Sequence, residues 1–186
     1  MFCLPTGHYA VGAVSDPVTG SGRRPGTAGV IAKYPDIIKR TVAQIHLEQL
    51  AAMEWLDLPK GWGPTGRPAQ ENWIPTPATH ETSMKMFLAT TKGLDPKFSR
   101  SGLVESGQAP GEGGQLRSMG IPGIGLMGSP HYFFRADPKG VIDKLSPQVM
   151  HNQVEITTRL LAMMDRLTSE QMKGTTPISA AELGQA

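Results

Sequence analysis

The sequence predicts one α/β domain, because short apolar segments of strand length alternate with amphipathic segments of helical spacing. Its 186 residues suit a single domain, and a hydrophobic share of 39% is sufficient for a core. The 22 glycines and 16 prolines indicate that turns and loops take a large part of the chain. We expect the domain to span residues 1–172 and a polar, flexible tail to span residues 173–186.

The first part of the chain predicts two strands, two helical pieces and a long connection. Residues 2–4 are apolar and precede a Pro-Thr-Gly turn, which is typical of a short strand. Residues 27–34 are compatible with a helix, and Pro35 starts a further helical turn. Residues 42–48 predict a buried strand with a polar end. The Pro- and Gly-rich residues 59–77 predict a functional loop or a flexible excursion, because they are too many for an ordinary connection.

The middle of the chain predicts one helix and two further strands. Residues 79–91 have a threonine cap, apolar residues at helical spacing and a glycine beyond their end. Residues 102–105 and 121–127 are short apolar runs bounded by glycine and proline, with a small helical piece around Leu116 between them. We expect these two strands to share one sheet with residues 42–48.

The C-terminal helix carries the clearest local signals. Ser146 is a capping residue and Pro147 occupies the first helical position, so we expect a helix from Pro147 to about Met172. Its expected buried stripe consists of Met150, Val154, Leu161 and Met164. If Leu161 is buried, Leu161→Ala should cost about 2–5 kcal/mol of stability.

Composition excludes several classes of protein. A net charge of +2 gives no electrostatic footprint for nucleic acid or for an anionic membrane. No run approaches the length of a membrane-spanning helix, and the first residues lack the features of a secretory signal, so the cellular location stays open. A single cysteine, Cys3, excludes an intrachain disulfide framework. The common local signatures of metalloproteases, serine hydrolases and phosphate-binding loops do not occur.

His46 and Glu48 are the first candidate for chemistry. Alternation along a strand places both side chains on one face, where they could share a metal ion. The alternative is a hydrogen-bonded histidine–glutamate pair without a metal. Among the other histidines, His131 directly follows a core strand and is a candidate, whereas His80 is explained by a helix start and His151 by an exposed helix face.

Three segments of the chain share the pattern of one protein family. Residues 34–40 read YPDIIKR and lead into Ile45-His46-Leu47-Glu48, residues 119–126 read MGIPGIGL, and residues 142–147 read IDKLSP. In this order they resemble the C-terminal half of the zinc-dependent aminopeptidase and glutamate-carboxypeptidase family, over about residues 1–170. The resemblance implies a three-layer α/β/α sandwich of the zinc-exopeptidase type without its N-terminal strands.

The resemblance also implies a zinc site. Glu48 stands where the family has a ligand aspartate, and His131 lies near the place of a late ligand histidine. His46 and His8 complete the set of implied metal ligands. The family's paired glutamates would fall near residues 7–9, which contain no glutamate.

Two further residues are the expected contacts of a substrate. Glu112 lies in the Gly-rich loop before the second core strand, and Tyr132 lies next to His131. The substrate itself is expected to be a small molecule or a peptide.

Together these features predict a metal-dependent hydrolase of amide (peptide) or ester bonds, with a zinc-bound water as nucleophile and an acidic side chain as base. The alternative is a catalytically inactive remnant of the same fold that acts as a binding or assembly module. In both cases we expect a homo-oligomer, because missing strands leave an open sheet edge.

Overall fold

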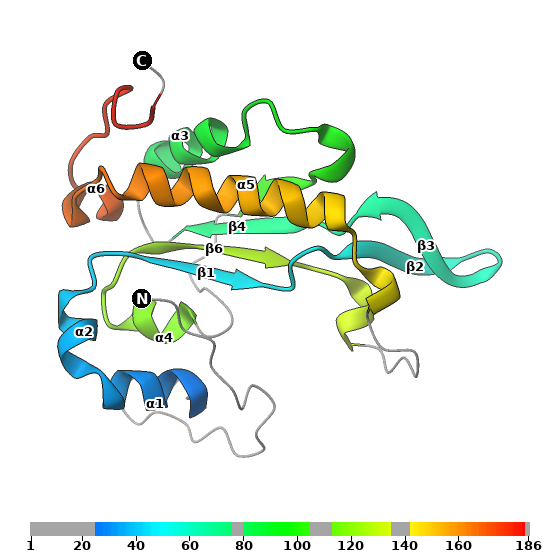
Figure 1. Cartoon of the computed structure of the whole chain (residues 1–186), viewed down its shortest axis with the longest axis horizontal. Coiled ribbons are helices and arrows are strands. Elements are labelled where there is room, and N and C mark those ends of the chain that lie inside the picture. Colours follow the sequence, from blue (N-terminus) through cyan, green and yellow to red (C-terminus); the bar gives the residue numbers. More distant parts are fainter. Residues whose placement is uncertain (1–24, 76–79, 105–112, 135–141, 185–186) are drawn as a thin grey trace.

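A mixed four-stranded sheet organises the chain (Figure 1). The computed structural model describes residues 25–75, 80–104, 113–134 and 142–184. The strand order in the sheet is β1 (Gln44–Glu48), β6 (Gly123–Gly128), β4 (Glu71–Pro75) and β5 (Ser101–Leu103). The three strands expected to share a sheet do so, which confirms the α/β class. The strand expected at residues 2–4 lies outside the described residues.

The directions of the strands differ from those of a purely parallel sheet. β1 is parallel to β6, with Ile45 opposite Ile124, and β4 is parallel to β5. β4 is antiparallel to β6, with Trp73 opposite Leu126. The carboxyl ends of β1 and β6 therefore meet the amino ends of β4 and β5 at the same edge of the sheet.

Helices lie on both sides of this sheet (Figure 1). Ile45 of β1 packs against the main core cluster, which includes Leu160 of the long helix α5. The preceding residue, Gln44, bonds instead to Gly113 of α4 on the opposite face. The helices are α1 (Pro25–Lys33), α2 (Pro35–Arg40), α3 (His80–Thr91), α4 (Gly113–Ser118), α5 (Pro147–Met164) and α6 (Ser169–Lys173), with short 3-10 turns η1 (Pro96–Phe98), η2 (His131–Phe134) and η3 (Ile142–Lys144).

The main core lies between the sheet and the helices α3 and α5. Trp73 and Leu126 from the sheet are 1% and 0% exposed, and Leu160 from α5 is 0% exposed. Trp73 also makes an edge-to-face contact with Phe87 of α3, with ring centroids 5.2 Å apart. No helix in the described ranges combines the length and apolarity needed to cross a membrane.

The C-terminal helix begins as expected and ends earlier. Ser146 accepts a hydrogen bond from the Val149 amide, and Pro147 is the first helical residue. The prediction of one helix to about Met172 was wrong, because α5 ends at Met164 and α6 restarts at Ser169. Thr168 and Gln171 form a reciprocal capping box at that restart, so the local sequence itself specifies the break.

The stripe predicted to be buried on this helix was wrong for three of its four residues, and only Met164 packs, partly buried, against the main core. Met150, Val154 and Leu161 are 36%, 54% and 47% exposed. The buried face of α5 consists of Val149, Asn152, Gln153, Ile156, Leu160 and Met163.

The segment predicted to be a flexible tail contributes side chains to the main core. Ile178 and Leu183 are 7% and 8% exposed within the core cluster. Glu182 receives hydrogen bonds from the Ser179 amide and from the Gln171 side chain, which connects this segment to α6. Because the segment is mainly polar, its composition did not indicate that Ile178 and Leu183 are buried.

Residues 59–75 are largely ordered strand and not one long loop, contrary to the prediction for residues 59–77, of which the last two lie outside the described residues. β2 (Met53–Leu58) and β3 (Gly61–Pro68) form an antiparallel hairpin that extends beyond the end of the main sheet, and β4 follows (Figure 1). Gly61 has a φ of 107°, a backbone conformation that suits glycine at the hairpin turn. The two strands of a hairpin each have an unpaired edge, where prolines such as Pro64 are tolerated.

Candidate functional site

The His46–Glu48 pair lies at the carboxyl end of β1. The two side chains share the face of the sheet that packs against α4, as the alternation of the strand predicted. His46 Nε2 lies 3.0 Å from Glu48 Oε2, and the side chains are 14% and 16% exposed. The structure therefore brings these two predicted residues into direct contact in a largely enclosed position.

Glycine lets the backbone of α4 approach the His46 ring closely. A Cβ at Gly113 would lie 2.8 Å from His46 Cβ, which is closer than side chains tolerate. Gln44 holds the start of α4 in place, since its Nε2 donates to the Gly113 carbonyl at 3.0 Å. This packing limits the orientations of the imidazole and keeps Nε2 toward Glu48.

The turn after β1 fixes the end of the strand that carries Glu48. Gln49 and Ala51 have left-handed φ values of 55° and 64°, which cost non-glycine residues about 1–2 kcal/mol each. The Ala51 amide donates to Gln153 Oε1 at 2.6 Å, and the Ala51 carbonyl accepts from the Ser146 amide at 2.9 Å. The two contacts tie the strained turn to α5, one at its N-cap and one at Gln153 within the helix.

The remaining predicted site residues are placed as follows. His8 and Glu112 lie outside the described residues. His131 begins η2 directly after β6 and is exposed. Tyr132 is 5% exposed, and its hydroxyl donates to the Lys144 carbonyl at 3.4 Å. Within the described ranges, no group of three or more His, Cys, Asp or Glu side chains could hold a metal ion. A role of Tyr132 in substrate binding stays a prediction.

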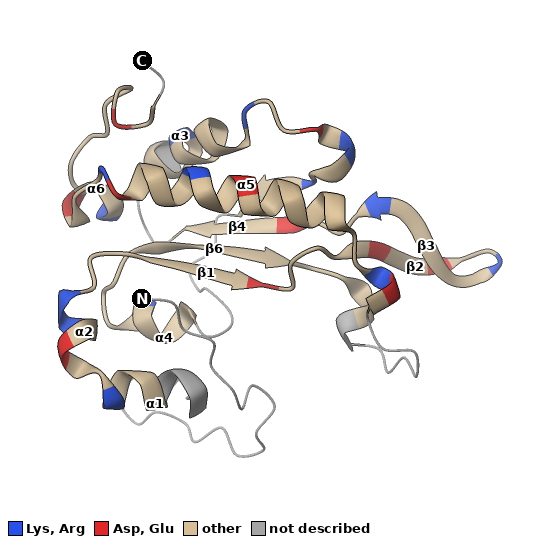
Figure 2. Ribbon diagram, viewed as in Figure 1, with Lys and Arg blue, Asp and Glu red and all other residues tan. Residues whose placement is uncertain are grey.

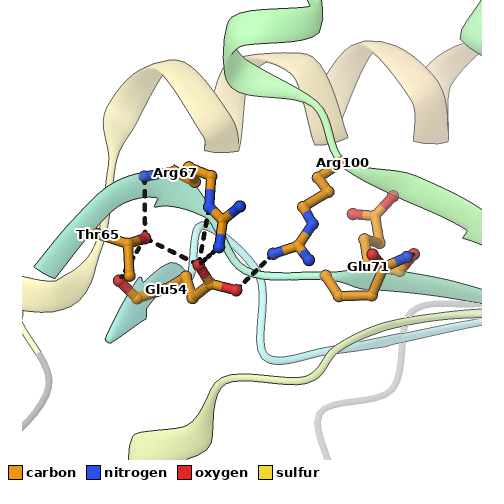
Figure 3. A network of polar contacts seen from close by, with 6 residues as sticks. Glu54, Thr65, Arg67, Glu71 and Arg100 are labelled. Carbon is orange, nitrogen blue, oxygen red and sulfur yellow. Dashed lines mark hydrogen bonds and ion pairs between the residues drawn. The ribbon is translucent and has the colours of Figure 1, made fainter. Parts of the chain in front are cut away.

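A second polar cluster, which the sequence analysis missed, connects the hairpin to the main sheet (Figure 3). Glu54 of β2 is 7% exposed and contacts Arg67 at 2.6 Å and Arg100 at 2.5 Å. Thr65 donates to Glu54 Oε2 at 2.9 Å. Burial alone raises the pKa of Glu54, but the hydrogen bonds from Arg100, Arg67 and Thr65 lower it to about 2 overall. Glu54 is therefore charged at every physiological pH.

Glu71, at the amino end of β4, has the opposite electrostatic environment. Its side chain is 3% exposed and accepts hydrogen bonds from Ser101 at 2.9 Å and from Gln153 at 2.5 Å. Burial raises the pKa of Glu71, and these hydrogen bonds offset only part of that effect. The two carboxylates lie on opposite sides of Arg100 in Figure 3, and this side chain bonds to Glu54.

Glu71→Gln should be at least as stable as the wild type at about pH 3 and more stable at about pH 8. The amide reproduces the hydrogen bonds of the neutral carboxyl, whereas the wild type must ionise a buried group as the pH rises through its raised pKa. Urea unfolding at both pH values measures the difference. Glu170→Gln, on the exposed side of α6, is the matched control, and an equal effect of both substitutions at about pH 8 would contradict the burial argument.

Lys144 occupies an aromatic enclosure beside the hairpin. Its side chain is 0% exposed, and Nζ lies 4.8 Å from the Trp55 ring centroid and 5.9 Å from that of Tyr132. Asp143 pairs with Nζ at 2.8 Å. The ion pair and the aromatic ring faces stabilise the buried ammonium group of Lys144. These contacts join η3 to the hairpin and to η2.

Comparison of the chain with protein-family models, with curated proteins and with solved structures gave no match.

Proposed function

We propose that this chain is a metal-dependent hydrolase-like protein that acts on amide (peptide) or ester bonds, and that His46 and Glu48 supply two ligands of its metal ion. One observation carries the proposal. The imidazole Nε2 and a carboxylate oxygen lie 3.0 Å apart, enclosed, at the carboxyl end of an edge strand of the described sheet. That place is where the resembled family has a ligand carboxylate.

The donor atoms fit zinc in type and in spacing. Zinc takes imidazole nitrogen and carboxylate oxygen at about 2.0–2.2 Å, which puts two ligands of a tetrahedral shell about 3.4 Å apart. The observed separation of 3.0 Å is within a few tenths of an ångström of that value. When bound, a zinc or manganese ion would activate a water molecule and polarise the scissile carbonyl. His8 and His131 are proposed for the remaining protein ligands.

The protein's own residues orient this pair. The Gly113 backbone restricts the imidazole, and the turn at Ala51, tied to Gln153, fixes the strand end behind Glu48. Helices on both faces of a mixed sheet further support the proposed zinc-exopeptidase type of sandwich (Figure 1).

Metal analysis of the purified full chain tests the proposal. We expect about one zinc or manganese ion per chain and slow hydrolysis of amide or ester reporters. Glu48→Ala should abolish both, and Glu170→Ala, which removes an exposed carboxylate, should change neither. A Glu48→Ala protein with unchanged metal content and activity would refute the assignment.

One observation favours a second candidate, a catalytically inactive binding or assembly module. His46 and Glu48 already bond to each other, and the described residues hold no group of three metal ligands. A folded preparation that takes up no zinc or manganese on titration would establish this alternative over the hydrolase.

A further inference from the structure

β1 presents backbone groups along an edge of the described sheet. Among the described strands it pairs only with β6. The Gln44 amide donates to the Pro122 carbonyl at 2.9 Å, on the side of β6. Because backbone groups alternate along a strand, the N–H and C=O groups of Ile45 and Leu47 point away from β6.

Within the described residues, β1 lacks three of the features that prevent the association of edge strands. Natural edge strands carry lysine, proline or a bulge that blocks pairing. Residues 44–48 contain neither lysine nor proline, and they pair with β6 residue by residue without a bulge. Figure 2 shows β1 uncharged except at its end, where Glu48 lies.

An exposed apolar surface lies beside this edge. Leu47 is 41% exposed, and the flank of α5 adds Met150, Val154 and Leu161 at 36%, 54% and 47%. Arg159, on the other flank of α5, donates to the Thr90 and Lys92 carbonyls at the end of α3. Because α3 covers the β5 side of the sheet, the apolar flank of α5 faces the β1 side.

We propose that this surface binds a second copy of the same chain, with the two β1 strands paired antiparallel about a two-fold axis at His46. The strand is complementary to itself in this register. Ile45 lies opposite Leu47 of the second copy, and Gln44 lies opposite Glu48 of the second copy, so that no like charges oppose. Other registers lose one of these matches.

The hydrogen-bond pattern agrees with this register. Ile45 and Leu47 have outward backbone groups, so each Ile45–Leu47 pair exchanges two hydrogen bonds. His46 uses its backbone groups toward β6, as a residue at the centre of a non-hydrogen-bonded pair requires. The α5 helices run antiparallel to each other across the axis and cover their apolar flanks. The result is a continuous eight-stranded sheet, counted as two copies of the four described strands.

Light scattering of the full chain tests the association. We expect a mass of about 40 kDa at micromolar concentration, twice the chain mass of 20.0 kDa. Leu47→Lys places a charge at the paired edge and should give a folded monomer of half that mass. Leu88→Lys, at a 55% exposed position of α3 on the far side, should leave the dimer intact. A monomeric wild type, a dimeric Leu47→Lys protein, or a monomeric Leu88→Lys protein would overturn the proposal.

Disulfide trapping tests the register. In a Cys3→Ser background, which removes the single natural cysteine, His46→Cys should form an intermolecular disulfide under mild oxidation. Non-hydrogen-bonded pairs place Cα atoms about 4.5 Å apart, which a disulfide spans. Glu48→Cys should not cross-link, because its counterpart lies about 13 Å along the strand. Cross-linking of Glu48→Cys, or failure of His46→Cys in a protein that is still dimeric, would overturn this pairing.

Discussion

Leu160→Ala should lower the free energy of unfolding by about 2–5 kcal/mol. Leu160 is 0% exposed and lies in the core cluster with Leu126 and Ile156, which are 0% and 1% exposed. Truncation removes apolar contacts and leaves a cavity between α5 and the sheet, where both walls are regular elements that cannot collapse easily. Urea unfolding followed by circular dichroism measures the loss.

The neighbouring leucine is the matched control. Leu161 is 47% exposed, so Leu161→Ala should change stability by no more than about 0.5 kcal/mol. Both substitutions are best made in a Leu47→Lys background, so that association between copies does not contribute. Equal losses at positions 160 and 161, or a larger loss at 161, would mean that α5 packs with a different face.

This pair of residues shows where the sequence misleads. Apolar residues mark two adjacent stripes on α5, and the true core face contains Asn152 and Gln153. Both polar residues are buried because they have partners, since Asn152 donates to the Asp95 carbonyl and Gln153 bonds to Glu71. The hydrophobicity pattern of α5 cannot show that these two residues have hydrogen-bond partners, because the partners lie far away in the sequence.

Local signals predicted the elements that are defined locally. The Ser146 cap, the strand 44–48 and the helix 80–91 follow from capping and periodicity. β4 and the β2–β3 hairpin were not predicted. Their segments are rich in glycine and proline, which are typical of loops, and the pairing of these strands depends on residues far away in the sequence. The direction of β4 is likewise a property of the assembled sheet.

The polar residues of the candidate site were likewise predictable only where they are close together in the sequence. His46 and Glu48 are two residues apart, so the period of a strand was sufficient to bring them together. The cluster around Glu54 takes its side chains from β2, β3 and the residue before β5. No spacing in the sequence predicts that Glu54, Arg67 and Arg100 come together. The alternation in residues 53–58 and the turn after them do indicate a hairpin.

Glu54→Gln should lower the free energy of unfolding by about 1.5–3 kcal/mol at neutral pH, the range for hydrogen bonds that involve charged groups. The glutamine keeps the shape of the side chain but loses the charge between Arg67 and Arg100. These arginines are 59% and 39% exposed, so water solvates them in the variant and limits the loss. Because the cluster joins the hairpin to the main sheet, hydrogen exchange in β2 and β3 should also increase.

The pH dependence separates charge from packing in this cluster. The pKa of Glu54 is about 2 in the folded chain, below its ordinary value of 4.5. A lowered carboxyl pKa stabilises the folded state above the ordinary value and loses that effect as the pH falls toward 2. The difference between wild type and Glu54→Gln should therefore be constant above about pH 5, decrease as the pH falls, and be lost only below about pH 2, where Glu54 is mostly protonated in the folded chain. Glu155→Gln, in the exposed pair with Arg159 on α5, should cost at most about 0.5 kcal/mol. A Glu54→Gln deficit as large at about pH 2 as at neutral pH would assign the loss to packing, because about half of the Glu54 carboxyls are already protonated at that pH.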